Sequence, residues 1–485
     1  MRRLMSARLP AVRGRAWQGW IGIRPRPAAG LGEPPGATSP TSRLITAVAV
    51  AFAVVVAAPA IGAVGAEKEP VPAAGGGAKG GSSASHWVNT WVSMPQLTEP
   101  GNMPPAPFTQ DGLVLADATL RQTVRVTVGG RQMRLRFSNA FGGVALPITK
   151  VSIALPAGGA AGVTGIQAGT SRPVTFNGRP GVSIPVGSLA VSDPLNFTLA
   201  PRTNLAVTIY LATGQASNNI TSHPGSRTSS YIVSGDHVTD QDLTGATRTD
   251  HWYFLSGVEV WSPGSTAGVV MLGDSLTDGR GSTTNGNDRW PDQLLDRLQA
   301  NPSTRDIAVL NQAAGGNRVM NDGLGPNALA RLDRDVLAQS GAEWLLVFEG
   351  VNDIGTAAAT QAAQETVAAD LIAAYEQIIT RAHAKNLKVY GATITAFGGN
   401  VPGYDDPDGF RENARQIVNR WIRTSGRFDA VIDFDRVTRD PANPRQLLPA
   451  YDVGDHLHFN PTGYKAIADS VPARLFQDSG HWGFE

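Results

Sequence analysis

A serine directly after an apolar run is the first residue of this sequence whose position indicates chemistry. The run Val269–Leu272 has the character of a buried strand, and Gly273-Asp274-Ser275 follows it without a gap. Ligands of α/β proteins bind at the carboxyl ends of parallel strands, so a serine hydroxyl at such an end is available as a nucleophile. Asp and Ser are also favoured helix N-caps, and the turn taken alone fits a cap as well as a nucleophile.

A histidine and an acid near the end of the chain could activate this serine. A serine nucleophile needs a base that accepts its proton and a group that orients the base. His458 and Asp455, three positions apart, have the right types for these two tasks. His456 is a second candidate for the base. The remaining histidines have no acid or nucleophile context, and the segment 223–227 (His-Pro-Gly-Ser-Arg) is typical of a turn that lines the site only if the preceding region leans over it.

Three further groups could stabilise the tetrahedral oxyanion of an acyl transfer, which requires hydrogen-bond donors aimed at it. The candidates are the backbone N–H of Ser275, the backbone N–H of Gly316 and the side-chain amide of Asn352. A glycine at position 316 would let the backbone approach a substrate closely. The chemistry indicated by this set is acyl transfer through a serine.

A parallel sheet is the element that would bring these residues together. From Ala267 onward, apolar runs without alternation are separated by segments of helical periodicity, which is typical of a sheet covered on both faces. The candidate residues follow the ends of these runs and would share one edge of the sheet. The predicted strands are 269–272, 308–310, 344–348, 389–393 and 431–434, and helical periodicity occurs at 293–298, 328–337, 369–384, 411–422 and after Pro461.

Residues 86–262 have a different pattern, which predicts an antiparallel β-sandwich or jelly roll. Apolar and polar residues alternate over Thr119–Val128, and turn residues recur between several such segments. Gly129-Gly130 has the composition of a hairpin turn that leads into a return strand containing Met133, Leu135 and Phe137. The alternation also predicts that one face of each sheet is solvated.

The amino-terminal segment is expected to direct the protein out of the cell. Residues 1–66 contain a basic flank, an uncharged run from Leu44 and then small residues, which is the order of a secretory signal. The alternative is an uncleaved membrane anchor, because the run has about the 20 residues that a spanning helix needs. Residues 67–85, rich in Gly, Pro and Ser, are predicted to be a flexible linker.

Composition excludes several classes of function. The chain has 485 residues, 42% of them hydrophobic, and a formal net charge of +1, which describes a globular protein without a polyanion-binding field. Nucleic acid is therefore not expected as a partner. The absence of cysteine excludes disulfides, a thiolate nucleophile and cysteine-ligated zinc.

Four blocks of this sequence resemble those of the SGNH, or GDSL, hydrolase family. They are Gly273-Asp274-Ser275-Leu276, Gly316-Asn317, Gly350-Val351-Asn352-Asp353 and Asp455-His456-Leu457-His458, in the family's order and at its spacing over about residues 267–475. The resemblance implies a flavodoxin-like three-layer α/β/α domain over 263–485. The β-sandwich-like domain over 86–262 lies outside the core family and more loosely resembles the N-terminal region of some secreted GDSL esterases. The resemblance of the four blocks also implies a Ser275 nucleophile, a His458 base oriented by Asp455, and oxyanion donors at Ser275, Gly316 and Asn352. The family's Asp-x-x-His spacing selects His458 over His456, and no metal or organic cofactor is implied.

The expected protein is a secreted serine hydrolase that cleaves short acyl or acetyl esters on a small molecule, glycan or lipid. A lipase or phospholipase is the sibling alternative, although the polar segment Gly398–Gly409 does not resemble an amphipathic lid. A non-catalytic carbohydrate-binding protein is the alternative from another class.

Three further polar residues have expected roles near the site. Asp353 is expected to cap a helix, and Asp278 to hydrogen-bond the nucleophile turn. Arg318 is expected to bind a substrate carboxylate or to pair with an acid.

Overall fold

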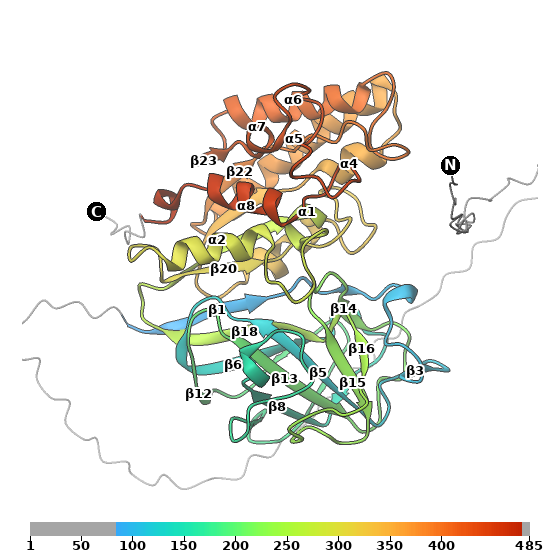
Figure 1. Ribbon diagram of the computed structural model, residues 1–485, viewed down its shortest axis with the longest axis vertical. Coiled ribbons are helices and arrows are strands. Elements are labelled where there is room, and N and C mark those ends of the chain that lie inside the picture. Colours follow the sequence, from blue (N-terminus) through green and yellow to red (C-terminus); the bar gives the residue numbers. More distant parts are fainter. Residues whose placement is uncertain (1–83, 478–485) are drawn as a thin grey trace, which may run out of the picture. The chain divides into compact units, whose positions relative to one another are not determined.

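The computed structural model describes residues 84–477, in which a β-rich region is followed by a region with a parallel sheet (Figure 1). The change occurs between β18, which ends at Ser262, and β19, which begins at Ala267. The predicted signal or anchor and nearly all of the predicted linker lie outside the described residues. Within residues 84–477, no helix combines the length and the apolar character needed to cross a bilayer.

The β-rich region is built from antiparallel sheets, as the alternation predicts. One sheet has the order β1-β18-β6-β11, with β12 also paired to β6, and a second has the order β16-β15-β5-β13-β8-β9. A third, smaller sheet has the order β17-β14-β2. The bounds are β1 His86–Val92, β2 Gln96–Leu97, β3 Thr109–Gln110, β4 Leu113–Val114, β5 Ala118–Arg125, β6 Gly130–Ser138, β7 Leu146–Ile148, β8 Lys150–Ala154, β9 Arg172–Val174, β10 Val182–Ile184, β11 Leu189–Val191, β12 Leu195–Leu199, β13 Asn204–Leu211, β14 Thr221–His223, β15 Ser230–Ser234, β16 Thr247–Thr249, β17 Trp252–Tyr253 and β18 Leu255–Ser262.

The predicted hairpin at Gly129-Gly130 is wrong. Strands β5 and β6 on either side of it lie in different sheets and do not pair with each other. Neither glycine has the positive φ that a two-residue hairpin turn requires. They are needed for close packing instead, because a Cβ on Gly129 would lie 2.4 Å from the Leu199 carbonyl oxygen and one on Gly130 2.8 Å from the Val260 Cβ.

The expectation of one solvated face per sheet also fails, at β5. Seven of its eight residues are buried, including Arg121 and Gln122. Loops cover the face that contains Arg121, whose guanidinium donates to the carbonyls of Thr164 and Asp240, the latter at 2.7 Å. On the opposite face, beside Leu120 and Val124, Gln122 donates to the carbonyl of Tyr253 in β17 at 3.0 Å. Burying a polar group costs little folding free energy when the group is hydrogen-bonded inside the protein. A polar residue in an alternating pattern therefore does not have to face water.

The second region confirms the predicted α/β fold. Its five parallel strands have the order β20-β19-β21-β22-β23, a doubly wound arrangement with β19 in the interior. All seven residues of β19 are buried, which explains its uninterrupted apolar sequence. The strands are β19 Ala267–Gly273, β20 Ile307–Asn311, β21 Ala342–Phe348, β22 Lys388–Ala392 and β23 Ala430–Ile432.

Two groups of helices pack with this sheet (Figure 1). Helix α8 contacts both α2 and α7, and α2 reaches β20. Helices α3, α4, α5 and α6 form the second group, in which α5 reaches β22. The bounds are α1 Ser275–Asp278, α2 Trp290–Gln299, α3 Ala328–Leu332 continued by a π-helical turn Asp333–Leu337, α4 Val351–Thr356, α5 Gln361–His383, α6 Phe410–Thr424, α7 Phe434–Thr438 and α8 Pro461–Ser470, with short 3-10 turns at Pro100–Asn102, Ala157–Gly159 and Ala473–Phe476.

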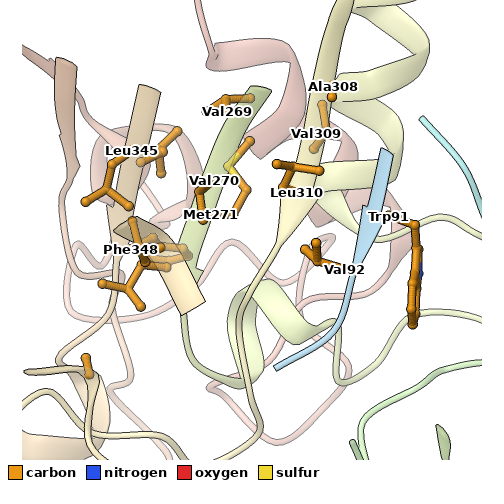
Figure 2. Packing of buried hydrophobic residues seen from close by; sticks show 14 of the residues in the cluster. Trp91, Val92, Val269, Val270, Met271, Ala308, Val309, Leu310, Leu345 and Phe348 are labelled. Atoms are coloured by element: carbon orange, nitrogen blue, oxygen red, sulfur yellow. The ribbon is translucent and has the colours of Figure 1, made fainter. Parts of the chain in front are cut away.

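Strand β1 joins the two regions. It pairs with β18 on one side and contacts β20 on the other. Figure 2 shows Val92 of β1 near Leu310 of β20, and both belong to one hydrophobic cluster that runs through the two regions. Burying an aliphatic side chain of this size contributes about 1.5–3 kcal/mol, so a continuous core holds the β-rich region firmly beside the sheet.

Candidate active site

The turn after β19 places Ser275 at the start of a helix. Asp274 is the N-cap of α1, and its Oδ1 accepts a hydrogen bond from Leu276 N at 2.9 Å. Burial raises the pKa of Asp274 well above its usual value, and the nearby Glu349 adds to this shift. The capping role that the sequence left open therefore falls to Asp274, while the Ser275 hydroxyl is free for another partner.

That partner is His458. The Ser275 Oγ lies 2.8 Å from His458 Nε2, and His458 Nδ1 lies 2.7 Å from Asp455 Oδ2. A carboxylate only accepts hydrogen bonds, so Nδ1 carries the proton and Nε2 is left to accept the serine proton. Asp455 Oδ1 also accepts from His458 N at 2.8 Å, which fixes the acid against the base. Ser275 and His458 are 6% and 7% exposed, so both are shielded yet reachable.

The electrostatics of this pair favour a neutral base. Burial lowers the pKa of His458, the Asp455 carboxylate opposes that change, and the net result is a pKa below the usual value. Partial burial works to raise the pKa of Asp455, but hydrogen bonds from the His458 backbone and ring bring it below its usual value. At neutral pH the imidazole is therefore unprotonated beside an ionised acid, as a general base requires.

The pH profile of ester hydrolysis should show this shift. Only the neutral imidazole can accept the serine proton, so kcat/KM should fall as the pH drops through the pKa of His458 in the free enzyme. Because that pKa lies below 6.5, the acidic limb should have its midpoint on the acid side of 6.5. Steady-state kinetics between about pH 4 and 9 measure it. A midpoint above pH 6.5, or a flat profile, would contradict the assignment of His458 as the base.

The candidate oxyanion donors have free hydrogens. Within residues 84–477, neither Ser275 N nor Gly316 N donates a hydrogen bond. The side-chain amide of Asn352, in the first turn of α4, donates one hydrogen to the Asn317 carbonyl at 2.8 Å. Its NH₂ group has a second hydrogen that remains available. All three residues line the cavity described below.

Tyr404 holds Asn352 in place, which nothing in the sequence indicates. Its hydroxyl donates to Asn352 Oδ1 at 2.6 Å. In the same loop, Asn400 Nδ2 donates to the Asp455 carbonyl at 2.7 Å and Asn400 Oδ1 accepts from Tyr404 N at 2.8 Å. The segment Gly398–Gly409, predicted to be polar, thus links Asp455 to Asn352, the candidate oxyanion donor. Burial raises the pKa of Tyr404 to about 12, so the hydroxyl stays a donor.

Tyr404→Phe should lower kcat about tenfold with a much smaller change in KM. The substitution leaves Asn352 Oδ1 without its donor, and loss of a buried hydrogen bond costs about 1–3 kcal/mol. An amide that acts on the oxyanion is needed only in the transition state, so kcat and kcat/KM should fall together. Tyr231→Phe, which removes a hydroxyl bonded to the Gly162 carbonyl, is the control. A rise in KM at constant kcat would contradict the role in positioning.

Two polar residues that the sequence singled out have other roles than expected, and for Arg318 the binding of a substrate carboxylate stays a prediction. Asp353 does not cap a helix: it lies inside α4 and accepts from Val319 N at 2.8 Å and Met320 N at 3.1 Å, because its carboxylate faces the preceding loop. Asp278 makes no side-chain hydrogen bond to the nucleophile turn within residues 84–477, and its Oδ1 lies 2.9 Å from His223 Nε2 of the β-rich region. Among residues 84–477 Arg318 has no ion-pair partner, and its guanidinium donates to the carbonyls of Asn321 and Asp322 and to the Thr356 hydroxyl.

His456, the alternative base, points elsewhere. Its Nδ1 lies 2.7 Å from Asp452 Oδ2, and about half of its side chain is exposed. The structure brings together Ser275, His458 and Asp455, and leaves His456 outside this chain of hydrogen bonds.

A cavity of about 440 Å³ opens over the serine, and the β-rich region supplies one of its walls. The contact between the two regions includes His223 Nε2, 2.9 Å from Asp278 Oδ1. Local sequence cannot reveal this contact, because the two residues are 55 positions apart. The lining residues from the β-rich region are Gln96, Glu99, Asn102, Pro224, Gly225, Arg227 and His251, and those from the α/β region include Ser275, Asp278, Arg280, Gly316, Leu324, Asn352, Tyr404 and His458.

Comparisons with known proteins bear on the α/β region. Residues 269–471 match the family model GDSL-like Lipase/Acylhydrolase. None of the curated proteins matches the chain. Similar solved structures include a G-D-S-L family protein from Desulfitobacterium hafniense (19% identity, 43% of this chain and 99% of that one, TM-score 0.32). Others are the acetyl xylan esterase AlAXEase (21%, 42% and 96%, 0.31) and a GDSL-like lipase from Bacteroides thetaiotaomicron (14%, 44% and 88%, 0.31).

Proposed function

We propose a mechanism and a substrate range for a chain that belongs, over residues 269–471, to the GDSL-like lipase/acylhydrolase family and is therefore a carboxylic ester hydrolase. The observation that carries the mechanism is the continuous hydrogen-bonded path from Ser275 Oγ through His458 to Asp455. It supports a Ser-His-Asp triad in which Ser275 is the nucleophile, His458 the base and Asp455 the group that orients it.

In the first half of the reaction, Ser275 Oγ attacks the ester carbonyl while its proton passes to His458 Nε2. The tetrahedral oxyanion is held by Ser275 N, Gly316 N and the Asn352 amide. Its collapse expels the alcohol, which takes the proton from His458, and leaves an acyl-serine. In the second half, water gives a proton to His458 and attacks the acyl-serine, and the acid leaves with the serine reprotonated.

The cavity supports esters with a short acyl group on a polar alcohol. Its lining is rich in charged and amide side chains. The aliphatic side chains in the lining are those of Leu324, Leu457 and Pro224. The loop 398–409 is tied to Asp455 and Asn352 by hydrogen bonds and has no amphipathic helix that could open over a lipid surface. Acetyl and other short acyl esters, on a small molecule or a glycan, therefore suit the cavity better than long-chain lipids do.

A panel of p-nitrophenyl esters tests the enzyme and its acyl preference together. We expect kcat/KM to be largest for acetate or butyrate and to fall toward laurate and palmitate. Labelling with a fluorophosphonate, followed by mass spectrometry, should place the adduct on the peptide that contains Ser275. Rising activity with chain length would favour the lipase alternative, and an adduct on another serine would overturn the assignment of the nucleophile.

We propose that the mature protein acts outside the cell, on the grounds of the signal-like order within residues 1–66. Expression of the full chain, with sequencing of the amino terminus of the product, tests this. A mature terminus shortly after Ala66 in the culture medium is the expected result. Recovery of the uncleaved chain in the membrane fraction would favour an anchor instead.

A further inference from the structure

Two arginines of the cavity are not used by the triad or by the oxyanion donors. Arg280 comes from the turn that follows the nucleophile helix, and Arg227 comes from the β-rich region. Within residues 84–477, neither guanidinium group makes a hydrogen bond to the protein. Each group carries five N–H donors in a planar fork, so two sets of donors face a cavity that also contains the catalytic serine.

Arg280 is held by its backbone while its side chain is exposed. Its N–H donates to the Ser275 carbonyl at 3.0 Å, and its carbonyl accepts from the Tyr464 hydroxyl at 2.7 Å. These bonds fix the start of the side chain close to the nucleophile. No acid lies within ion-pair distance of the Arg280 guanidinium in the described residues.

Arg227 occupies an unusual backbone position. Its φ of +50° lies in the left-handed region, which costs a residue with a Cβ about 1–2 kcal/mol and is commonly occupied by Gly, Asn or Asp. Backbone strain that is maintained in a folded protein is often associated with function. The Arg227 carbonyl accepts from Asn285 N at 2.9 Å, so the α/β region anchors this turn. The Arg227 Nε is buried and has no hydrogen-bond partner.

The turn that carries Arg227 is seated against the nucleophile helix. Gly225 lies so close to Asp278 that an added Cβ would be 1.8 Å from Asp278 Oδ2. His223 bonds the other carboxylate oxygen of Asp278. The placement of Arg227 therefore depends on contacts between the two regions and is not that of a freely moving surface residue.

The acidic residues of the cavity accept no hydrogen bond from either arginine. Glu99 accepts hydrogen bonds from Gln96 Nε2 at 2.6 Å and Asn102 Nδ2 at 2.9 Å. Asp278 is buried and bonded to His223, and it forms a long ion pair with the Arg227 guanidinium at 3.8 Å that leaves the N–H donors of Arg227 without a hydrogen bond to it. Both guanidinium groups also act on the catalytic base, since their charges help to lower the pKa of His458.

We propose that Arg227 and Arg280 form an anion subsite that selects esters carrying a carboxylate or phosphate group near the scissile bond. The proposal rests on the function proposed above and narrows its substrate class. Arginine recognises both anions with paired N–H donors, and such charge-assisted hydrogen bonds are among the strong ones. A cavity of about 440 Å³ lies within the range of small-molecule sites, which leaves room for a sugar or a glycerol phosphate over Ser275.

Matched pairs of esters test the subsite and separate the two anions. One pair is acetylated galacturonic acid and acetylated galactose, which differ by a carboxylate. The other is acetylated glycerol 3-phosphate and acetylated glycerol, which differ by a phosphate. Each is assayed with the full-length wild type, Arg227→Gln, Arg280→Gln, the double variant, and Arg172→Gln as a control. Arg172 is an exposed arginine of the β-rich region that lies outside the cavity and donates to the Gly169 and Ser171 carbonyls.

In the wild type, kcat/KM should be at least tenfold higher for the anionic member of one pair. Each cavity variant should lower the anionic-to-neutral ratio about 10-fold to 100-fold, as expected for a lost hydrogen bond to a charged group. Arg172→Gln should keep the wild-type ratio. The pair that shows the preference identifies carboxylate or phosphate as the anion.

Equal kcat/KM for both members of both pairs, or a preference that survives in the double variant, would overturn the subsite. Hydrolysis of the neutral esters that is lost in Ser275→Ala would still support the proposed function in that case. If none of the four esters is cleaved, calorimetric titration of the wild type with inorganic phosphate and with galacturonate tests whether the subsite binds an anion. Absence of binding, or binding that persists in the double variant, would then overturn it.

Discussion

Ser275→Ala should reduce kcat for p-nitrophenyl acetate by about 10⁴-fold to 10⁶-fold, because it removes the atom that forms the acyl-enzyme. The residual rate should come from the oxyanion donors and substrate binding alone. His458→Ala should have an effect of the same order, and the double variant should be little worse than either, since the two side chains act as one unit. Asp455→Ala should lower kcat less, because in the proposed triad Asp455 only orients His458 and does not touch the substrate.

Ser282→Ala is the matched control for this experiment. Ser282 lies in the same turn region, but its hydroxyl donates to the Gly279 carbonyl at 2.6 Å and does not line the cavity. Its removal should leave ester hydrolysis close to the wild-type rate. Substantial activity in Ser275→Ala, with the same thermal unfolding midpoint as the wild type, would show that another residue is the nucleophile.

Asn352→Ala should lower kcat by about 10²-fold to 10³-fold, the range found when one oxyanion donor is removed. The amide hydrogen that Asn317 does not use is the one available to the oxyanion, and this bond strengthens as charge develops on the carbonyl oxygen. KM should change little, because the neutral ester gains less from the same donor than the transition state does. Steady-state kinetics with p-nitrophenyl acetate measure both constants.

Asn443→Ala provides the control for the loss of an asparagine, since Asn443 is exposed and its side chain makes no hydrogen bond to any residue of 84–477. A thermal unfolding measurement on Asn352→Ala separates catalysis from folding, because Asn352 also bonds the Asn317 carbonyl. A change in KM alone, or a loss of kcat below about threefold, would contradict the role in the oxyanion site.

In the β-rich region, local sequence patterns predict the strands but not how two of them are connected or which polar side chains are buried. Alternation predicted its strands and antiparallel pairing, but Gly129-Gly130 joins two sheets and makes no hairpin. Glycine serves close backbone approach as well as tight turns, and only the neighbouring atoms of Leu199 and Val260 distinguish the two uses. In the same way, the burial of Arg121 and Gln122 in β5 depends on a loop and a strand that supply hydrogen-bond partners from distant parts of the chain.

The sequence by itself determined the α/β domain and the residues proposed for its chemistry. Buried parallel strands need continuous apolar runs, and ligand sites follow their carboxyl ends, so the spacing of Ser275, Gly316, Asn352 and His458 contained the information. Tertiary structure alone decided what surrounds them. Tyr404 reaches Asn352 across 52 positions, and the turn that carries Arg227 reaches the nucleophile helix through packing of one region on another. Such contacts depend on how helices, strands and loops that are distant in the sequence pack against one another. Local periodicity in the sequence reports only the buried face of a single element, so it cannot predict them.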